Sequence, residues 1–453
     1  MQTRILLLLP ALVCLPALAQ TGLDEAIANA PPLSQSDMLV PPPVSDTPYA
    51  RTVGAEERSN FLRIGLTASG GYVSNLSPGS AGSNFSGATY LLQPMIEFNR
   101  TGTRLHSTIS YTPSFAWYQL PNVVNTTDHG LTANAQIRLS PHVNLLANET
   151  FRKMSTGFGQ NTANFQPVVG GGSQFVAPGI YGLFEPQESN QSIAVLTWQF
   201  TRDDMIAGSG SIGTLRFSTP AESGGLYNST QPGGSASWTH RVGVRQYLGG
   251  LYQYSFVQER PPASSGEAGS VDTQTDGLFS FYTVYLTPHS SVSVQGGDQH
   301  VTITDLQTHS SYGNWSPGGR ASLGWQGEHT AVAFSYSRLV TAGQGLRSGY
   351  LTNSVAGTGE WQMARNWSAE FYGGYSTLSN AVAATLPDAA AEYGHTITGG
   401  VTLGHRITQS VQLSGKYDRI HQSYGNLPSI SAHPDSDRVL FSVTYLLSRP
   451  IGQ

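Results

Sequence analysis

The chain of 453 residues has almost no cysteine, little charge and no long apolar stretch beyond its first twenty residues. Its one cysteine, Cys14, lies in that N-terminal stretch, which leaves the rest of the chain without disulfides or thiolate metal ligands. Charged residues make up 11% of the sequence, well below the roughly 25% of ordinary soluble domains. After Gln20, no apolar run approaches the ~18 residues that indicate a membrane-spanning helix. These absences exclude a disulfide scaffold and a helical membrane protein.

Basic residues are also few, and they form no patch along the sequence. Only Lys153 and Lys416 are lysines, and without Arg4 the chain has 22 basic and 28 acidic residues, a net charge of −6. We therefore expect no nucleic-acid partner. The histidines show no metal-ligand spacing, and the glycine runs at 170–172 and 318–319 do not join a strand to a helix. The sequence therefore predicts neither a metal site nor another cofactor.

The first 57 residues differ from the rest. Residues 1–19 are expected to form a secretory signal peptide, with Arg4 as its positive charge and Ala17-Leu18-Ala19 as a small-residue cleavage site. Residues 20–57 contain Pro31-Pro32 and Pro41-Pro42-Pro43 and lack any alternation of apolar and polar residues. They are predicted to form a Pro-rich periplasmic tail. Residues 58–453 form the remaining domain.

This domain consists of runs in which apolar and polar residues alternate, as in strands with two different faces. Apolar faces in three of the runs comprise Tyr90, Leu92, Ile96 and Phe98; Leu131, Ala133, Ala135, Ile137 and Leu139; and Ala236, Trp238, Val242 and Val244. The opposite faces of the same runs carry Thr89, Gln93 and Glu97; Thr132, Asn134, Gln136 and Arg138; and Ser237, Thr239, Arg241 and Arg245.

Eighteen such runs are joined by connectors that are alternately long and short. The long connectors are roughly 74–86, 119–127, 155–189, 218–233, 260–272, 303–317, 341–353, 377–391 and 421–435. The short connectors are Asn99–Gly102, Ser140–His142, Arg202–Asp204, Leu248–Gly250, Thr287–Ser290, Gly327–His329, Ala364–Asn366 and Arg406–Thr408. Long extracellular loops and short periplasmic turns alternate in this way in outer-membrane barrels.

We therefore predict an all-β fold, a transmembrane antiparallel up-and-down β-barrel of about 18 strands, with 16–18 compatible with the pattern. The expected location is the outer membrane of a Gram-negative bacterium, with both termini in the periplasm. A soluble β-sandwich would also have one apolar and one polar face. It is disfavoured because the runs are longer than its usual strands, because the connectors alternate in length, and because aromatic residues gather near strand ends.

Two motifs suggest catalysis, and each has a simpler structural explanation. His421 and Ser423 are two residues apart on one predicted strand, so a histidine base would share a face with a serine hydroxyl, as in some outer-membrane lipid hydrolases. The same spacing recurs at His309 and Ser311, and both motifs precede Tyr-Gly-Asn, which favours a role at the start of a loop. The Asp203-Asp204 pair falls in a short turn. We therefore expect no enzyme, and a hydrolase using His421 and Ser423 remains the alternative.

Charged residues on the polar faces are candidates for the wall of a water-filled lumen. The candidates for selectivity are Glu97, Arg138, Arg241, Arg245 and Glu370, with Arg63 and Arg216 as further members. Ion pairs that only hold neighbouring strands together are the alternative explanation. The longest connector, 155–189, is a candidate constriction loop whose amide and aromatic side chains suit sugars; these are Phe158, Gln160, Asn161, Asn164, Phe165 and Gln174.

The first hairpin resembles a known family. The sequence Gly65-Leu66-Thr67-Ala68-Ser69-Gly70-Gly71-Tyr72-Val73-Ser74-Asn75, followed by Tyr90-Leu91-Leu92-Gln93-Pro94, is similar to the start of a family of β-barrel porins of bacterial outer membranes. Some members are encoded with exopolysaccharide genes. Val73 stands where members often have an acidic residue. The resemblance implies a porin-like channel and suggests polysaccharide export, and it implies no catalytic residues.

The sequence thus leaves three functions open: a channel for polar solutes such as saccharides, a barrel lipid hydrolase, and a structural or adhesive barrel. The expected partners are outer-membrane lipid and lipopolysaccharide, the barrel assembly machinery, a polar solute or saccharide, and further copies of the chain in a homo-oligomer. Many outer-membrane barrels end in an aromatic residue that the assembly machinery recognises, and Tyr445 is the candidate for that role here.

Overall fold

The computed structural model describes residues 60–74, 86–119, 125–155, 187–217, 227–261, 270–287, 289–341, 349–381, 394–424 and 435–450. None of these residues forms a helix that is long and apolar enough to cross a membrane. The predicted signal peptide and Pro-rich tail lie outside the described residues and remain predictions.

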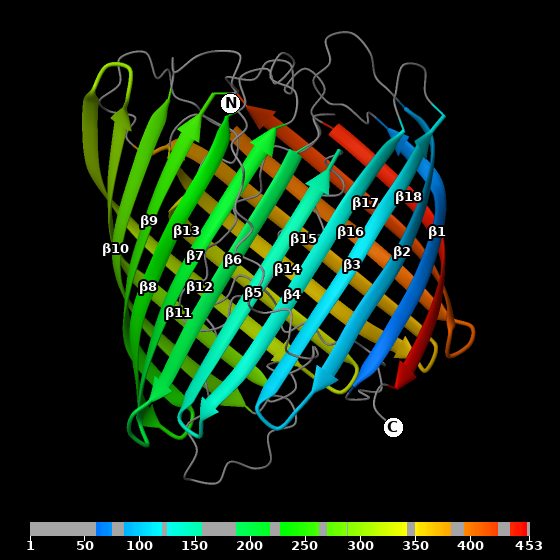
Figure 1. The fold of residues 1–453 in the computed structure, drawn as a ribbon, viewed down its shortest axis with the longest axis horizontal. Coiled ribbons are helices and arrows are strands. Elements are labelled where there is room, and N and C mark those ends of the chain that lie inside the picture. Colours follow the sequence, from blue (N-terminus) through cyan, green and yellow to red (C-terminus); the bar gives the residue numbers. More distant parts are fainter. Residues whose placement is uncertain are drawn as a thin grey trace, which may run out of the picture.

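Eighteen strands form one antiparallel sheet in which each strand pairs with its neighbours in the sequence, and β1 also pairs with β18 (Figure 1). The sheet therefore closes on itself, which confirms the predicted barrel. The strands are β1 (Phe61–Ser74), β2 (Gly87–Thr101), β3 (Leu105–Tyr118), β4 (Thr126–Ser140), β5 (Val143–Met154), β6 (Gln187–Gln199), β7 (Asp204–Phe217), β8 (Asn228–Gly243), β9 (Gln246–Arg260), β10 (Val271–Thr287), β11 (Ser290–Asp305), β12 (Ser310–Gln326), β13 (Thr330–Thr341), β14 (Tyr350–Ala364), β15 (Trp367–Asn380), β16 (Gly394–Arg406), β17 (Val411–Tyr424) and β18 (Asp435–Pro450).

The two faces of the strands form an apolar outer wall and a largely polar inner wall. In β1, Ile64, Leu66 and Tyr72 are exposed on the outside, and Thr67 and Ser69 point inward between them. Each outer side chain lies opposite another in the neighbouring strand, because paired residues share a face of the sheet. The faces assigned from sequence alternation are therefore the two sides of the barrel wall.

Hydroxyl groups on the inner wall bind one another across neighbouring strands. Thr67 and Thr444 are joined by a hydrogen bond of 2.9 Å, and Ser69 and Ser442 by one of 2.8 Å, where β1 meets β18. Similar pairs join β7 to β8, β10 to β11, and β13 to β14. A hydroxyl both donates and accepts, so each pair satisfies two polar groups without a charge.

One predicted loop is wrong. The connector 303–317 was expected to be long, but β11 continues to Asp305 and β12 begins at Ser310, leaving only residues 306–309 between them. Asp305 Oδ1 accepts hydrogen bonds from the backbone amides of Gln307 and Thr308, at 2.8 and 3.1 Å. His309 adopts a φ of 53°. An aspartate cap and a left-handed residue close a tight turn here, and the Gly and Pro residues that suggested a loop lie within β12.

The remaining connectors keep the predicted alternation, with boundaries displaced by a few residues. The short turns gather at one end of the barrel, the lower end in Figure 1, called here the turn end. The opposite end is called the loop end. Phe61 of β1 pairs with Pro450 of β18, so both described ends of the chain lie at the turn end.

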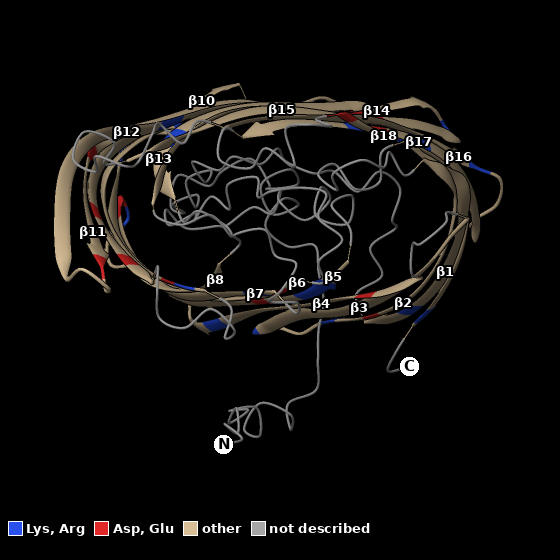
Figure 2. Cartoon of the chain, turned by 90° about the horizontal axis from the view of Figure 1, so that it is seen from above, with Lys and Arg blue, Asp and Glu red and all other residues tan. Residues whose placement is uncertain are grey.

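The barrel is oval in cross-section, with β11 at one narrow end (Figure 2). The inner wall is strongly curved there. Leu251, Phe279, Phe281 and Leu339 form a buried apolar cluster on the inside, contributed by β9, β10 and β13.

The sheet separates along part of its length between β12 and β13. Only Gly319–Gln326 of β12 pair with β13, where their partners are Ala331–Arg338. The strands themselves are longer, since β12 begins at Ser310 and β13 ends at Thr341. Proline has no amide hydrogen, and Pro317 occupies the position where the next ladder bond would form. We call the separated part, residues 311–318 of β12 and 339–341 of β13, the seam.

Beyond Arg338, β13 passes to the inside of the barrel (Figure 2). Val340 packs against a buried cluster that contains Val271, Val301 and Ile303, which lie on the inner faces of β10 and β11. Leu351 of β14 packs on the same cluster. The loop ends of β13 and β14 thus form a second layer behind β10 and β11.

The curvature at β11 predicts different responses at two adjacent glycines. A Cβ on Gly297 would overlap the carbonyl oxygen of Leu278, whereas a Cβ on Gly296 has no neighbour within 4 Å. Gly297→Val should therefore destabilise the barrel by roughly 1–3 kcal/mol or more through overpacking, and Gly296→Val should fold normally. The measurement is the fraction of refolded protein that resists unfolding in unheated SDS. Equal folded fractions for the two variants would contradict the curvature described here.

Candidate functional site

The inner wall of the barrel is the candidate functional surface, and four of the five predicted selectivity residues lie on it. Glu97, Arg138, Arg241 and Glu370 alternate with outward-facing apolar neighbours in β2, β4, β8 and β15. Each lies within four residues of the strand end that meets a short turn. They therefore share a level near the turn end, although they are distributed around the wall and do not meet at one point.

Glu97 is held by an ion pair. Its carboxylate lies 3.0 Å from the guanidinium of Arg63, the directly opposite residue of β1, and Glu97 is only 8% exposed. Arg63 also lies over the ring of Phe61, 4.7 Å from its centroid. The pair joins two neighbouring strands, so this part of the charged set matches the structural alternative considered from the sequence.

The two adjacent aspartates at the β6–β7 turn serve different sides of the wall. Asp203 Oδ1 accepts a hydrogen bond of 2.9 Å from Arg241 Nε on the inner wall. Asp204 Oδ1 lies 2.9 Å from His240 Nδ1, beside Trp238 on the outer wall. Because their side chains separate, Asp203 and Asp204 do not form a paired-carboxylate site.

Two arginines lie elsewhere than sequence alternation placed them. Arg245 belongs to the turn between β8, which ends at Gly243, and β9, so it is an exposed residue of the turn end and not of the strand wall. Arg216 pairs with Glu188, whose side chain is bound to Lys153 on the outer wall at 3.1 Å. The strand β8 ends before Arg245, which the sequence had placed within it, and the inner face assigned to Arg216 from the sequence was wrong.

Glu370 belongs to a larger cluster that sequence analysis did not identify. It lies directly opposite Glu360 of β14 on the inner wall. Across β16, the neighbouring part of β17 contributes Lys416 and Asp418, and β18 contributes Arg438. We call Glu360, Glu370, Tyr372, Lys416, Asp418 and Arg438 the inner charge cluster.

Asp418 is the centre of this cluster and is fully buried. Its carboxylate lies 2.7 Å from the Arg438 guanidinium and 3.1 Å from the Lys416 ammonium, and it accepts a 2.7 Å hydrogen bond from the Tyr372 hydroxyl. Tyr372 lies across Gly400, where a side chain would collide with its ring. The sequence signal was present, because Lys416 and Asp418 have the same parity as Gln412 and Ser414 on the polar face of β17.

His421 and Ser423 point outward near the loop end of β17. His421 lies opposite Ile397, an exposed residue of the outer wall, and Ser423 lies opposite His395. His421 Nδ1 is 3.1 Å from Asp435 Oδ1, and the His395 and His421 rings are 5.4 Å apart. Arg419 binds the same Asp435 carboxylate at 2.6 Å. The structure therefore adds an aspartate to the predicted His–Ser pair.

The candidate constriction residues Phe158, Gln160, Asn161, Asn164, Phe165 and Gln174 lie outside the described residues, so their role remains a prediction. Within the described ranges, no group of three or more His, Cys, Asp or Glu side chains is arranged to hold a metal ion.

No protein family and no curated protein matches this sequence. Among solved structures, the barrel is similar to the ferric citrate transporter FecA, with 10% identity and a TM-score of 0.43 over 82% of this chain and 61% of that one. OccAB4 of Acinetobacter baumannii shows 9% identity and a TM-score of 0.39, covering 87% of this chain and 99% of that one. OccK9 of Pseudomonas aeruginosa shows 10% identity and a TM-score of 0.40, covering 86% of this chain and 98% of that one. The chain thus spans about three fifths of the length of FecA.

The inner charge cluster predicts a large stability difference between two aspartate substitutions. Asp418→Asn should destabilise the barrel by roughly 3–5 kcal/mol, because it removes the buried carboxylate that two partly buried cations share. Asp435→Asn removes a carboxylate that also binds an arginine but is 45% exposed, and should cost less than about 1 kcal/mol. Guanidinium unfolding in detergent micelles, followed by tryptophan fluorescence, compares the two. Similar midpoints would contradict the central role of Asp418.

Proposed function

We propose that this protein is an outer-membrane channel for polar solutes. The observation that carries the proposal is a closed barrel of eighteen strands whose outer wall is apolar and whose inner wall is polar. A lipid bilayer provides no hydrogen-bond partners, and a closed barrel leaves no free edge to need them. Barrels of 16–18 strands are wide enough to enclose an aqueous path.

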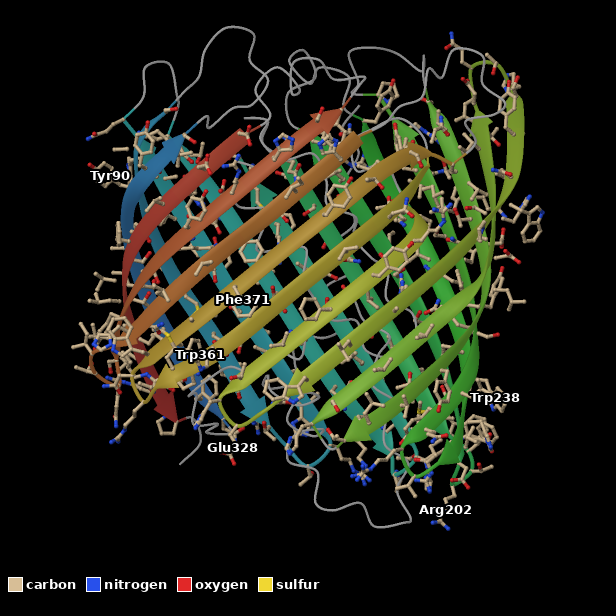
Figure 3. All side chains as sticks on the ribbon, turned by 180° about the vertical axis from the view of Figure 1, so that it is seen from behind. Tyr90, Arg202, Trp238, Glu328, Trp361 and Phe371 are labelled. Atoms are coloured by element: carbon tan, nitrogen blue, oxygen red, sulfur yellow. The ribbon has the colours of Figure 1, made fainter. Side chains whose placement is uncertain are left out.

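The outer wall has the height and borders expected of a membrane-embedded surface. Tyr90 lies near the loop end, and Trp238 and Trp361 lie near the turn end, with Arg202 and Glu328 beyond them (Figure 3). On β12, the exposed Trp315 and Trp325 are ten residues apart on the same face. Ten residues of a strand tilted by about 40° rise roughly 25 Å, the height of the apolar band of outer-membrane barrels.

The inner wall favours polar solutes of either charge. Arg63, Glu97, Arg138 and Arg241 lie near the turn end together with the acidic pair Glu360 and Glu370, so that level carries both cations and anions. Charges of both signs on opposite walls create a transverse field in which dipolar, hydroxyl-rich molecules align. We infer that saccharides are the preferred class, and that the porin resemblance of the first hairpin extends to polysaccharide export.

The proposal is tested by conductance. Purified protein in planar bilayers should open a stable aqueous path with weak ion selectivity, and liposomes containing it should swell in isotonic sugar solutions. The double substitution Glu360→Gln and Glu370→Gln should shift the reversal potential toward anion permeation, because two negative charges leave the inner wall. Glu149→Gln is the matched control, since Glu149 lies on the outer wall opposite Ala133 and Ser192. A bilayer that stays closed would overturn the channel proposal.

A lipid hydrolase is the second candidate, and one observation favours it. Asp435 binds His421 Nδ1 on the outer wall, in the orientation that leaves His421 Nε2 available as a base, and Ser423 lies on the same face. Arg419 competes for the same carboxylate. Ser423 lies opposite His395 of the neighbouring strand β16. The cluster is therefore equally suited to stabilising the loop ends of β17 and β18.

The two roles are separated by a hydrolysis assay. If the cluster is structural, detergent-solubilised protein should release no fatty acid from phosphatidylcholine, and Ser423→Ala should match the unsubstituted chain. Ser414→Ala, on the inner wall of the same strand, controls for damage to β17. Hydrolysis that disappears in Ser423→Ala but persists in Ser414→Ala would support the enzyme instead.

A further inference from the structure

The seam between β12 and β13 combines three properties. It interrupts the hydrogen-bond ladder, it carries a positive charge on its outer side, and it covers an apolar layer on its inner side. A role of the seam in lipid depends on the membrane placement proposed for the barrel.

The seam lies at the level of the outer leaflet. Gln326 pairs at the turn end of β12 and Gly319 is the last residue paired with β13, seven residues further along the strand. With the same tilt, seven residues rise about 18 Å, which is well short of the roughly 25 Å of the apolar band. The remaining part of the band, up to the level of Trp315, is where the two strands have separated.

Side chains replace some of the missing ladder bonds. Arg338 Nε donates to the carbonyl oxygen of Pro317 at 3.2 Å, and the amide of Val340 donates to Gln299 Oε1 at 3.1 Å. An unpaired backbone edge facing lipid is costly, and these contacts reduce the cost without rejoining the strands. They are also weaker constraints than a continuous ladder, because a rotation of one side chain breaks each of them.

Arg338 brings a positive charge to the outer side of the seam. By alternation it shares a face with the exposed Phe334 and Tyr336, and its register partner is Gly319. Its two hydrogen bonds go to neutral oxygens, those of Pro317 and Asn353, the latter at 2.9 Å. A guanidinium on a lipid-facing wall favours an anionic partner, and a carboxylate matches its planar pair of donors.

The layer beneath the seam suits an apolar chain. Val340 and Leu351 pack there against Val271, Val301 and Ile303. Next to this contact lies a small cavity with a mainly polar lining, in which Gln231, Gln253, Gln299 and Arg320 lie beside Phe279, Leu339 and Val340. Gln299 is 3% exposed and its Nε2 has no hydrogen-bond partner, which leaves one buried donor directed into this region.

We propose that the seam is a lateral binding site for a single-chain amphiphile with a carboxylate head, of the long-chain fatty acid class. Arg338 holds the head at the outer side, and the chain enters between the two layers, toward Val340 and Leu351. The contact between the layers separates to admit it. The site thereby connects the outer leaflet with the inside of the wall, independently of the path for polar solutes.

The two layers can be locked together to test this. A Cβ on Gly349, just before β14, would lie 3.7 Å from Thr273 Cβ of β10, within the range of a disulfide. The double variant Thr273→Cys and Gly349→Cys should therefore oxidise and fix the inner layer against β10. The control pair is Gly243→Cys and Gln246→Cys at the turn end, where the corresponding distance is 3.9 Å.

The full chain, reconstituted in phosphatidylcholine nanodiscs, is irradiated with diazirine-labelled palmitate, and labelled peptides are mapped by mass spectrometry. The unsubstituted chain should be labelled at the seam, on β12, on residues 338–341 of β13 and on Tyr350 and Leu351 of β14. The oxidised seam pair should lose labelling of Val340 and Leu351 and regain it on reduction, whereas the control pair should label normally in both states.

Arg338→Gln keeps a donor for Pro317 but removes the charge. It should reduce labelling at the seam by roughly tenfold, the size expected for loss of one charge-assisted contact. Labelling no stronger at the seam than around Phe371, elsewhere on the outer wall, would overturn the proposal, as would labelling unchanged by both the lock and Arg338→Gln. Conductance is measured on the same samples. A conducting protein without seam labelling refutes the lateral site alone, a closed protein with seam labelling refutes the channel alone, and a closed protein without seam labelling refutes both.

Discussion

The structure depends on the requirement that every backbone amide and carbonyl of the sheet has a partner. A sheet with two free edges fails that requirement in an apolar surrounding, and closure between β1 and β18 meets it. Closure fixes the direction of every side chain, because alternate residues must then point inside or outside. Closure therefore separates the polar residues of each strand into an inner wall and the apolar residues into an outer wall.

The backbone hydrogen bonding of the sheet is less complete at the seam between β12 and β13. At the seam, Pro317 ends the ladder, and Arg338 and Gln299 bind single backbone groups in its place. The overlap of β13 and β14 with β10 and β11 then covers the gap with apolar side chains. The strong curvature of the wall at β11 and the separation of β12 from β13 occur in the same region of the sheet.

Much of this fold could be predicted from the sequence, because strand alternation and connector length are local properties. They gave the number of strands, the faces of Tyr90 and Glu97, and the common end of the described chain termini. The β11–β12 hairpin could not be predicted, since Gly313, Pro317 and Gly318 indicate a loop by composition and are strand residues only because β11 pairs with them. The separation from β13 depends on packing between residues far apart in the sequence.

The candidate site could be predicted only in part, because strand alternation is a local property of the sequence. Alternation placed Glu97, Arg138, Arg241 and Glu370 on the inner wall. It does not show which residues of neighbouring strands lie opposite each other. The role of Asp418 as a shared partner for Lys416, Arg438 and Tyr372 requires that register. The positions of Asp203 and Asp204 could not be predicted either, because only the three-dimensional structure of the turn shows that their side chains point to opposite faces of the wall.

Because Phe61 and Pro450 are paired, the barrel does not depend on where along the circle of strands the chain begins. The described ends meet at the turn end, in a ladder of the same kind as the ladders between strands that follow one another in the sequence. A short linker from Pro450 to Asn60 would therefore resemble any other turn of the barrel, and new ends opened at another turn would leave the same circle of strands. The finished wall has no intrinsic first strand, so the order of β1 to β18 describes the synthesis of the chain and not a division within the barrel.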